Sequence, residues 1–291
     1  MEKREFLKMV ATGAVAGSAG ALVTSERQQP PHQHSSVETI YDRVMRFGVI
    51  KCGYLVRPPL FVKDPNTGDF SGVTYELMQA LGKSTGLNIE FTEEVGWSTM
   101  ISGLKSGRYD MMATSVWMNA SRAREVSFLE PLFYSGVGVF SRVDDQRFKS
   151  VADVNNSNVT IATIDGTTYD HIARLDFPQA KTLSLTQLNS LSEVLVQVET
   201  GKADVAIIES YEGTEYLHNN PGKLKDITTG KPIRYFGEAF MVPHKELAFS
   251  SMLNTALAEL KNSGLLDDLL DKYQIKAGSF FETTNQFQSI Q

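Results

Sequence analysis

The chain has 291 residues, a formal net charge of −6, 42% hydrophobic and 21% charged residues. This length holds two modest domains or one large one, and the composition is that of a globular protein. The acidic balance argues against a nucleic-acid partner, because phosphate binding needs a basic face. Cys52 is the only cysteine, which excludes an intramolecular disulfide and predicts a buried, inert thiol.

The N-terminal segment has the layout of an export signal. Basic residues Lys3, Arg4 and Lys8 precede an apolar run over residues 9–23 that is rich in Ala and Gly and ends in small residues. We therefore predict a signal peptide over residues 1–25 and a periplasmic location. The basic segment resembles the twin-arginine motif with Lys for the first Arg, so the export route stays open between the twin-arginine and the general pathway. No cysteine follows the run, which argues against a lipid anchor there.

Residues 26–42 are predicted to form a polar spacer. His32 and His34 lie in it, and we interpret them as solvated side chains and predict no metal site and no cofactor.

From residue 43 onward, short apolar runs alternate with segments of helical periodicity. In the first half we expect strands at 45–50, 89–91 and 111–113, and helices at 73–85 and 97–106 that end at Gly86 and Gly107. The apolar run at 133–140 is too long for a simple surface loop. In the second half we expect strands at 159–164, 183–185, 205–208 and 238–242, and helices after Gly166, at 188–200, at 247–260 and at 265–273. Alternation of this kind predicts parallel sheets covered by helices, and the tail from Gln274 is expected to fray.

One internal repeat organises the chain. Gly107-Arg108-Tyr109-Asp110 and Gly201-Lys202-Ala203-Asp204 each end a helix and precede a short strand that finishes in polar residues. Because ligands of open α/β sheets bind outside the carboxyl ends of strands, we expect Thr114, Ser115 and Glu209 to line a cleft between two lobes. The alternative is that these three side chains cap the helices that follow.

Five segments together point to a family. They are 72–77 (GVTYEL), 97–110 (WSTMISGLKSGRYD), 122–133 (RAREVSFLEPLF), 201–209 (GKADVAIIE) and 257–265 (LAELKNSGL). In this order they resemble the bacterial extracellular solute-binding proteins of family 3, the polar-amino-acid class, over roughly residues 43–275. The resemblance implies an α/β, two-lobed, type II periplasmic-binding-protein fold, in which each lobe is a mixed, mostly parallel sheet flanked by helices.

The resemblance also implies the division of the chain. Lobe 1 would comprise residues 43–134 and 238–275, and lobe 2 residues 135–237, with two strands crossing between the lobes as a hinge. Residues 276–291 are expected to form a frayed tail.

Binding roles follow from the resemblance at matching positions. Arg122 would bind a ligand carboxylate with its planar guanidinium, assisted by the hydroxyls of Thr114 and Ser115. The start of a helix at Gly166-Thr167-Thr168 would help to hold the same anion through its backbone N–H groups. Glu209 would pair with a ligand ammonium group.

Aromatic residues complete the predicted site. Trp97 would pack on the ligand's side chain, and core packing is its alternative reading. Tyr169 is a further candidate binding residue, in the helix that Thr167 begins.

Three departures from the family pattern bear on the ligand. Glu209 replaces the usual Asp, and Trp117 replaces a small Ser or Thr. Arg57 lies near the usual place of a cleft aromatic residue. This arginine indicates either a ligand with a second acidic group or an internal ion pair with Glu209 or with a surface carboxylate.

The resemblance implies a non-catalytic, monomeric binding protein that delivers a small amino-acid-like or carboxylate-bearing solute to the permease of an ABC transporter. A second reading is an enzyme like the cyclohexadienyl or arogenate dehydratases, with Glu209, Glu212 or His171 as acid or base. A third reading is a sensor or orphan binding domain without a transporter. Binding is favoured, because the sequence holds no nucleophile–base pair, metal cluster or phosphate loop.

Overall fold

The computed structural model describes residues 38–186, 189–273 and 279–282. The predicted signal peptide and residues 26–37 of the predicted spacer lie outside these residues, and the end of the spacer is not extended, because a helix begins at Ile40. Within them, no helix combines the length and the apolar character needed to cross a membrane.

The elements are as follows in chain order. The helices are α1 (Ile40–Phe47), α2 (Val73–Thr85), α3 (Met100–Lys105), α4 (Ala120–Ala123), the 3-10 helix η1 (Val151–Val154), α5 (Thr168–Asp176), α6 (Leu191–Glu199), α7 (Ser210–Asn219), α8 (Leu247–Asn262) and α9 (Leu265–Tyr273). The strands are β1 (Val49–Tyr54), β2 (Val62–Lys63), β3 (Phe70–Ser71), β4 (Asn88–Glu94), β5 (Met111–Met112), β6 (Val116–Trp117), β7 (Ser127–Phe128), β8 (Phe133–Arg142), β9 (Thr160–Ile164), β10 (Lys181–Leu185), β11 (Val205–Glu209), β12 (Leu224–Asp226), β13 (Arg234–Ala239), β14 (Met241–Val242) and β15 (Phe280–Glu282).

The first predicted strand, at 45–50, is wrong over most of its length. Residues through Phe47 belong to helix α1, and strand β1 begins at Val49. The reason is local capping: the Thr39 side chain accepts a hydrogen bond from the Asp42 N–H at the start of α1. Gly48 then ends the helix with a left-handed backbone, φ 68°, which glycine adopts without a steric penalty.

Two sheets organise the described chain. A parallel sheet has the order β4-β1-β5. A second, mixed sheet has the order β10-β9-β11-β8-β13-β6, in which β10, β9 and β11 run parallel and β8 and β13 pair antiparallel. The prediction of parallel sheets is therefore correct for the first sheet and for one side of the second.

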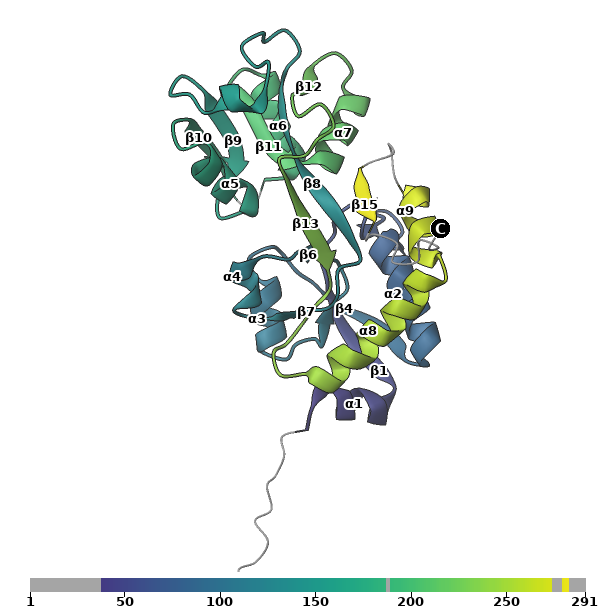
Figure 1. The fold of residues 1–291 in the computed structure, drawn as a ribbon. Coiled ribbons are helices and arrows are strands. Elements are labelled where there is room, and N and C mark those ends of the chain that lie inside the picture. The colour runs from purple at the N-terminus through teal and green to yellow at the C-terminus, as the bar shows by residue number, and fades with distance from the viewer. Residues whose placement is uncertain (1–37, 187–188, 274–278, 283–291) are drawn as a thin grey trace, which may run out of the picture. The chain divides into compact units, whose positions relative to one another are not determined.

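Strands β8 and β13 connect two groups of elements. Figure 1 shows both strands running between the region of α5, α6 and α7 and the region of α2, α3, α4 and α8. One large core packs α2, α8 and α9 against β1, and a separate core packs α5 and α6 against β9 and β11. The predicted lobe boundaries, at 134/135 and 237/238, fall inside β8 and β13 and stay predictions.

The predicted frayed tail contains one ordered strand. β15 pairs antiparallel with β8, and the Phe280 ring stacks on Tyr211 and contacts Phe133 edge-on. Burial of this apolar ring explains why the segment joins the sheet although the flanking sequence is polar.

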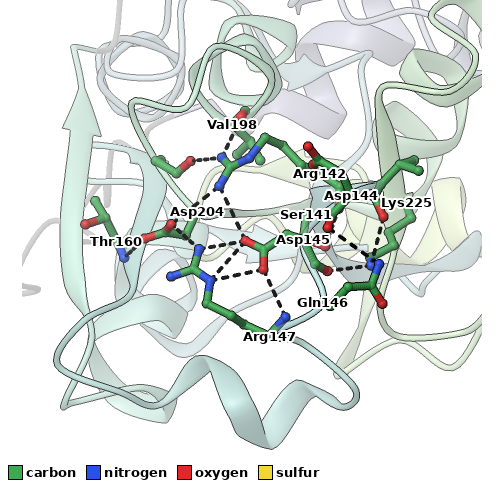
Figure 2. Close-up of polar contacts among 12 residues, drawn as sticks. Ser141, Arg142, Asp144, Asp145, Gln146, Arg147, Thr160, Val198, Asp204 and Lys225 are labelled. Carbon is green, nitrogen blue, oxygen red and sulfur yellow. Dashed lines mark hydrogen bonds and ion pairs between the residues drawn. The ribbon is translucent and has the colours of Figure 1, made fainter.

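The two aspartates of the internal repeat have a structural role. The Asp204 carboxylate accepts a hydrogen bond from the Thr160 N–H (2.8 Å), and it pairs with the guanidinium groups of Arg142 and Arg147 (Figure 2). Each aspartate thus fixes its own segment to a neighbouring strand, because Asp110 bonds β1 in the same way.

Candidate ligand-binding site

The described residues enclose a cavity of about 1180 Å³. Its lining comes from seven stretches of the chain, which include parts of α3, α4, α5, α6 and α7: 56–58, 97–101, 117–122, 164–174, 189–192, 212–220 and 234–236. Six predicted site residues lie in this lining: Arg57, Trp97, Trp117, Arg122, Thr167 and Tyr169.

Arg122 is placed by a short capped helix. The side chain of Asn119 accepts a hydrogen bond from the Arg122 N–H (2.9 Å) at the start of α4. The Arg122 guanidinium donates to the Trp117 carbonyl (2.8 Å) and forms no ion pair with any described residue. Burial lowers the pKa of Arg122 and Arg57 lowers it further, whereas the carboxylate of Glu238 raises it; the guanidinium remains a cation at neutral pH. A partly buried cation that lines a cavity and forms no ion pair with a described residue is suited to bind an anion.

Arg57 has the opposite environment. Its Nη2 pairs with Glu209, and its Nη1 donates to both carboxylate oxygens of Glu238 (3.0 and 3.2 Å) and to the Ser115 carbonyl (3.3 Å). Of the two readings of Arg57, the internal ion pair with Glu209 is the one found. Both acids are almost fully buried, with 1% and 0% of their surfaces exposed.

Glu212 is the acid of this cluster that reaches the cavity. Its Oε1 lies 3.9 Å from Arg57 Nε, and its buried Oε2 has no hydrogen-bond partner. Burial raises the pKa of the Glu212 carboxyl well above its usual value, and the neighbouring Glu209 raises it further. Glu212 therefore lies at the cavity wall, in surroundings that favour its carboxylic acid form.

Aromatic rings form much of the apolar wall. The Trp117 indole stacks on Phe236 at 4.5 Å and meets the Tyr169 ring edge-on at 4.9 Å. Its Nε1–H donates to Ser135, whose hydroxyl donates to Glu238 (3.1 Å). Trp97 lines the cavity, is partly buried, and has the guanidinium groups of Arg57 and Arg122 over its ring.

Thr167 begins helix α5. Its hydroxyl accepts from the Asp170 N–H (3.3 Å) and donates to the Ile164 carbonyl (2.6 Å). Gly166, Thr167 and Thr168 all line the cavity, so the positive end of the helix dipole lies at the cavity wall.

Three predicted residues lie outside the cavity lining: Thr114, Ser115 and Glu209. The Thr114 hydroxyl accepts from the Leu55 N–H (3.0 Å) and donates to the Leu55 carbonyl (2.8 Å), so its hydrogen bonds are made within the protein. The Ser115 hydroxyl is buried without a partner. Glu209 precedes α7 without capping it through its side chain, and Arg57 covers it instead.

Glu238 and Phe236 are among the residues at the site that the sequence did not single out. For Glu238 a signal exists, because an acid inside an apolar strand indicates a buried partner. Phe236 was also missed, because an aromatic residue in a strand has no signal that separates a cavity wall from a core. Among the described residues, no group of three or more His, Cys, Asp or Glu side chains is placed to hold a metal ion.

These features define a two-lobed α/β protein of the type II periplasmic-binding-protein fold. A model of the bacterial extracellular solute-binding proteins, family 3, matches residues 50–276, and the chain belongs to this family.

Named relatives of this chain include binding proteins and an enzyme. The ABC transporter arginine-binding protein 1 of Escherichia coli is 24% identical over 228 residues, which cover 77% of this chain and 90% of that protein. The cyclohexadienyl dehydratase of Pseudomonas aeruginosa is 21% identical over 237 residues, covering 81% and 86%. A solved ancestral amino-acid-binding protein, described as a precursor of cyclohexadienyl dehydratase, superposes with a TM-score of 0.69 at 23% identity and covers 81% of this chain and 100% of its own.

Proposed function

We propose that the protein is a non-catalytic, periplasmic binding protein that closes around a small carboxylate-bearing or amino-acid-like solute. It acts as a monomer, is exported by an N-terminal signal peptide and delivers the solute to the permease of an ABC transporter. Membership of the family and the number of binding proteins among the relatives support this proposal. Closure would move the elements on either side of β8 and β13 against each other.

One observation carries the proposal. The other arginines that line the cavity pair with carboxylates: Arg57 with Glu209 and Glu238, Arg174 with Asp170, and Arg234 with Asp176. Arg122 alone among them has no acidic partner in the described part of the chain. A ligand carboxylate would supply that partner through a bidentate, charge-assisted pair.

Thermal-shift screening tests the proposal. Carboxylates, amino acids and amines are added to the purified protein, and a ligand present at about 100 times its Kd should stabilise the folded state by about 2.7 kcal/mol. In Arg122→Ala this stabilisation should disappear. Arg124→Ala is the matched control, since Arg124 is exposed, lies two residues further on and does not line the cavity. Ligand-dependent melting that survives in Arg122→Ala would contradict the assignment of the site.

A second candidate function is supported by Glu212. A neutral carboxylic acid at a cavity wall can donate its proton to a leaving hydroxyl, so that water and carbon dioxide depart from a substrate such as prephenate. The dehydratase among the relatives makes this reaction relevant. Incubation with prephenate or arogenate, followed by detection of phenylpyruvate or phenylalanine, separates the two functions. Product formation that is lost in Glu212→Gln would establish the enzyme.

A further inference from the structure

The carboxylates that would receive a ligand ammonium are already occupied. The Arg57 guanidinium contacts Glu209 through one terminal nitrogen and both oxygens of Glu238 through the other. Because Glu209 and Glu238 are buried beneath this guanidinium, a solute in the cavity does not reach them. The protein's own side chain thus fills the place of a ligand cation.

Arg57 also lies close to the anion-binding residue. The guanidinium carbons of Arg57 and Arg122 lie 5.8 and 5.9 Å from the centroid of the same Trp97 ring. Burial lowers the pKa of Arg122, Glu238 raises it, and the positive charge of Arg57 lowers it, so all three groups act on one another. Both guanidinium groups therefore lie at the same Trp97 ring, so a carboxylate held by Arg122 lies near a second guanidinium that also lines the cavity.

The remaining acids do not supply the missing negative charge at that position. Burial and Glu209 raise the pKa of Glu212, and in its carboxylic acid form it donates a hydrogen bond to a keto or hydroxyl oxygen. Glu215 lines the cavity without an ion pair among the described residues, but it lies about 9 Å further along α7 than Glu209. Glu215 is therefore separated along the helix from the carboxylates that Arg57 covers.

We propose that the cavity selects carboxylic acids whose α-carbon bears a keto, hydroxyl or hydrogen substituent and rejects the corresponding α-amino acids, with Arg57 as the residue that determines this choice. The inference rests on the proposed function, since it takes the cavity to be the solute site. Its physical basis is that an ammonium beside Arg57 would lose its hydration and meet a guanidinium, whereas the two carboxylates that balance Arg57 lie outside the cavity lining. The aromatic wall favours acids with a planar apolar body.

Matched ligand sets provide the test. Each set differs only at the α-carbon: L-phenylalanine, phenylpyruvate and 3-phenylpropionate; L-leucine and 4-methyl-2-oxopentanoate; L-glutamate, 2-oxoglutarate and glutarate. Isothermal titration of the full chain should give a Kd at least about tenfold lower for the keto acid than for its amino acid in every set that binds. Equal or tighter binding of the amino acid overturns the inference and leaves the proposed function standing. No binding by any member of any set overturns both.

The Arg57→Gln variant tests whether Arg57 determines the selectivity. In Arg57→Gln the acids Glu209 and Glu238 lose their internal cation, so the preference should shift toward the amino acid by about tenfold or more. Arg147→Gln is the matched control, because Arg147 also pairs with two acids, Asp145 and Asp204, and does not line the cavity. The control should keep the preference for the keto acid. If Arg57→Gln fails to fold, the comparison of matched ligands on the unaltered chain still decides the question.

Discussion

Asp110 and Asp204 make the same backbone contacts in two different sheets. The Asp110 carboxylate accepts from the Lys51 N–H, and the Asp204 carboxylate accepts from the Thr160 N–H, both at 2.8 Å. The backbone N–H of each aspartate donates in turn to the carbonyl of the same partner, also at 2.8 Å. In each sheet, the aspartate of the Gly-basic-x-Asp repeat therefore holds its segment to a neighbouring strand through these two hydrogen bonds, an arrangement we call the clamp.

Asp204→Ala tests the clamp in the second sheet. The substitution leaves the Thr160 N–H and the guanidinium groups of Arg142 and Arg147 without this acceptor (Figure 2). We expect a loss of about 1–3 kcal/mol in the free energy of unfolding, measured by urea denaturation. Asp69→Ala is the control, because the Asp69 side chain is exposed. A loss no larger than that of the control would show that the clamp contributes nothing measurable.

Gly213→Ala should destabilise the protein even though alanine is the better helix former. A Cβ at position 213 would lie 1.9 Å from Cζ of Phe140, a ring that is 1% exposed. Overpacking of this kind costs about 1–3 kcal/mol, against a gain of about 1 kcal/mol from helix propensity. Urea denaturation should give a net loss, whereas the exposed His218→Ala on the same helix should stay near neutral.

A second substitution checks the cause of that loss. Phe140→Leu removes ring atoms that the new methyl group would meet, so the double variant should lose less stability than the sum of the two single variants. If the stability losses of the two single variants simply add in the double variant, the loss in Gly213→Ala does not arise from a clash with the Phe140 ring.

The sequence predicted the positions of helices and strands more accurately than the contacts between side chains. Periodicity and glycine positions located most helices and strands, because amphipathic faces and left-handed caps are local properties. Gly86, for example, ends α2 with φ 69°. The strand predicted at 45–50 failed because an apolar run of six residues does not distinguish a strand from a short capped helix.

The sequence predicted several residues that line the cavity, but it did not predict which side chains form ion pairs or hydrogen bonds with one another. Family resemblance selected Arg122 and Trp97, which both line the cavity. It also selected Thr114, whose hydroxyl is instead bound to the Leu55 backbone. Arg57 and Glu209 are 152 residues apart, and no local pattern specifies that one neutralises the other. Long-range ion pairing depends on how two groups of elements meet, which only the folded chain reveals.

Glu212 should make the stability of the protein fall as the pH rises. Burial and the neighbouring Glu209 raise its pKa in the folded state above the usual 4.5, so the folded state holds this proton more tightly than the unfolded state. The contribution is fully present below about pH 4.5 and is lost as the pH rises toward the folded-state pKa, by up to about 1.4 kcal/mol per pH unit. Glu212→Gln, which does not titrate, should therefore gain stability relative to the original chain between pH 5 and pH 8.

Urea denaturation at several pH values measures this difference. Glu90→Gln serves as the control, because Glu90 lies exposed on β4 and its substitution should leave the pH profile parallel to that of the unaltered chain. Parallel profiles for Glu212→Gln as well would show that Glu212 is ionised in the folded protein. That result would also remove the proton donor that the dehydratase reaction requires.

Trp97 should report ligand binding through its fluorescence. The chain has two tryptophans, and both line the cavity. Trp117 is held by stacking on Phe236, by an edge contact with Tyr169 and by a hydrogen bond to Ser135. Trp97, in contrast, is partly exposed and lies beside Arg57 and Arg122. An acid bound at Arg122 would cover the Trp97 ring and exclude water from it, which should shift its emission to shorter wavelength.

Titration with 3-phenylpropionate, with excitation selective for tryptophan, tests the assignment. Trp117→Phe should keep most of the emission change, and Trp97→Phe should lose most of it. Trp97→Ala should also weaken binding by about tenfold, since it removes an aromatic surface that packs on the ligand, a contact of about 0.5–1.5 kcal/mol beyond its buried area. An emission change that depends on Trp117 instead would mean that the ligand disturbs the Trp117–Phe236–Tyr169 wall. Trp97 would then be a wall residue that the ligand does not touch.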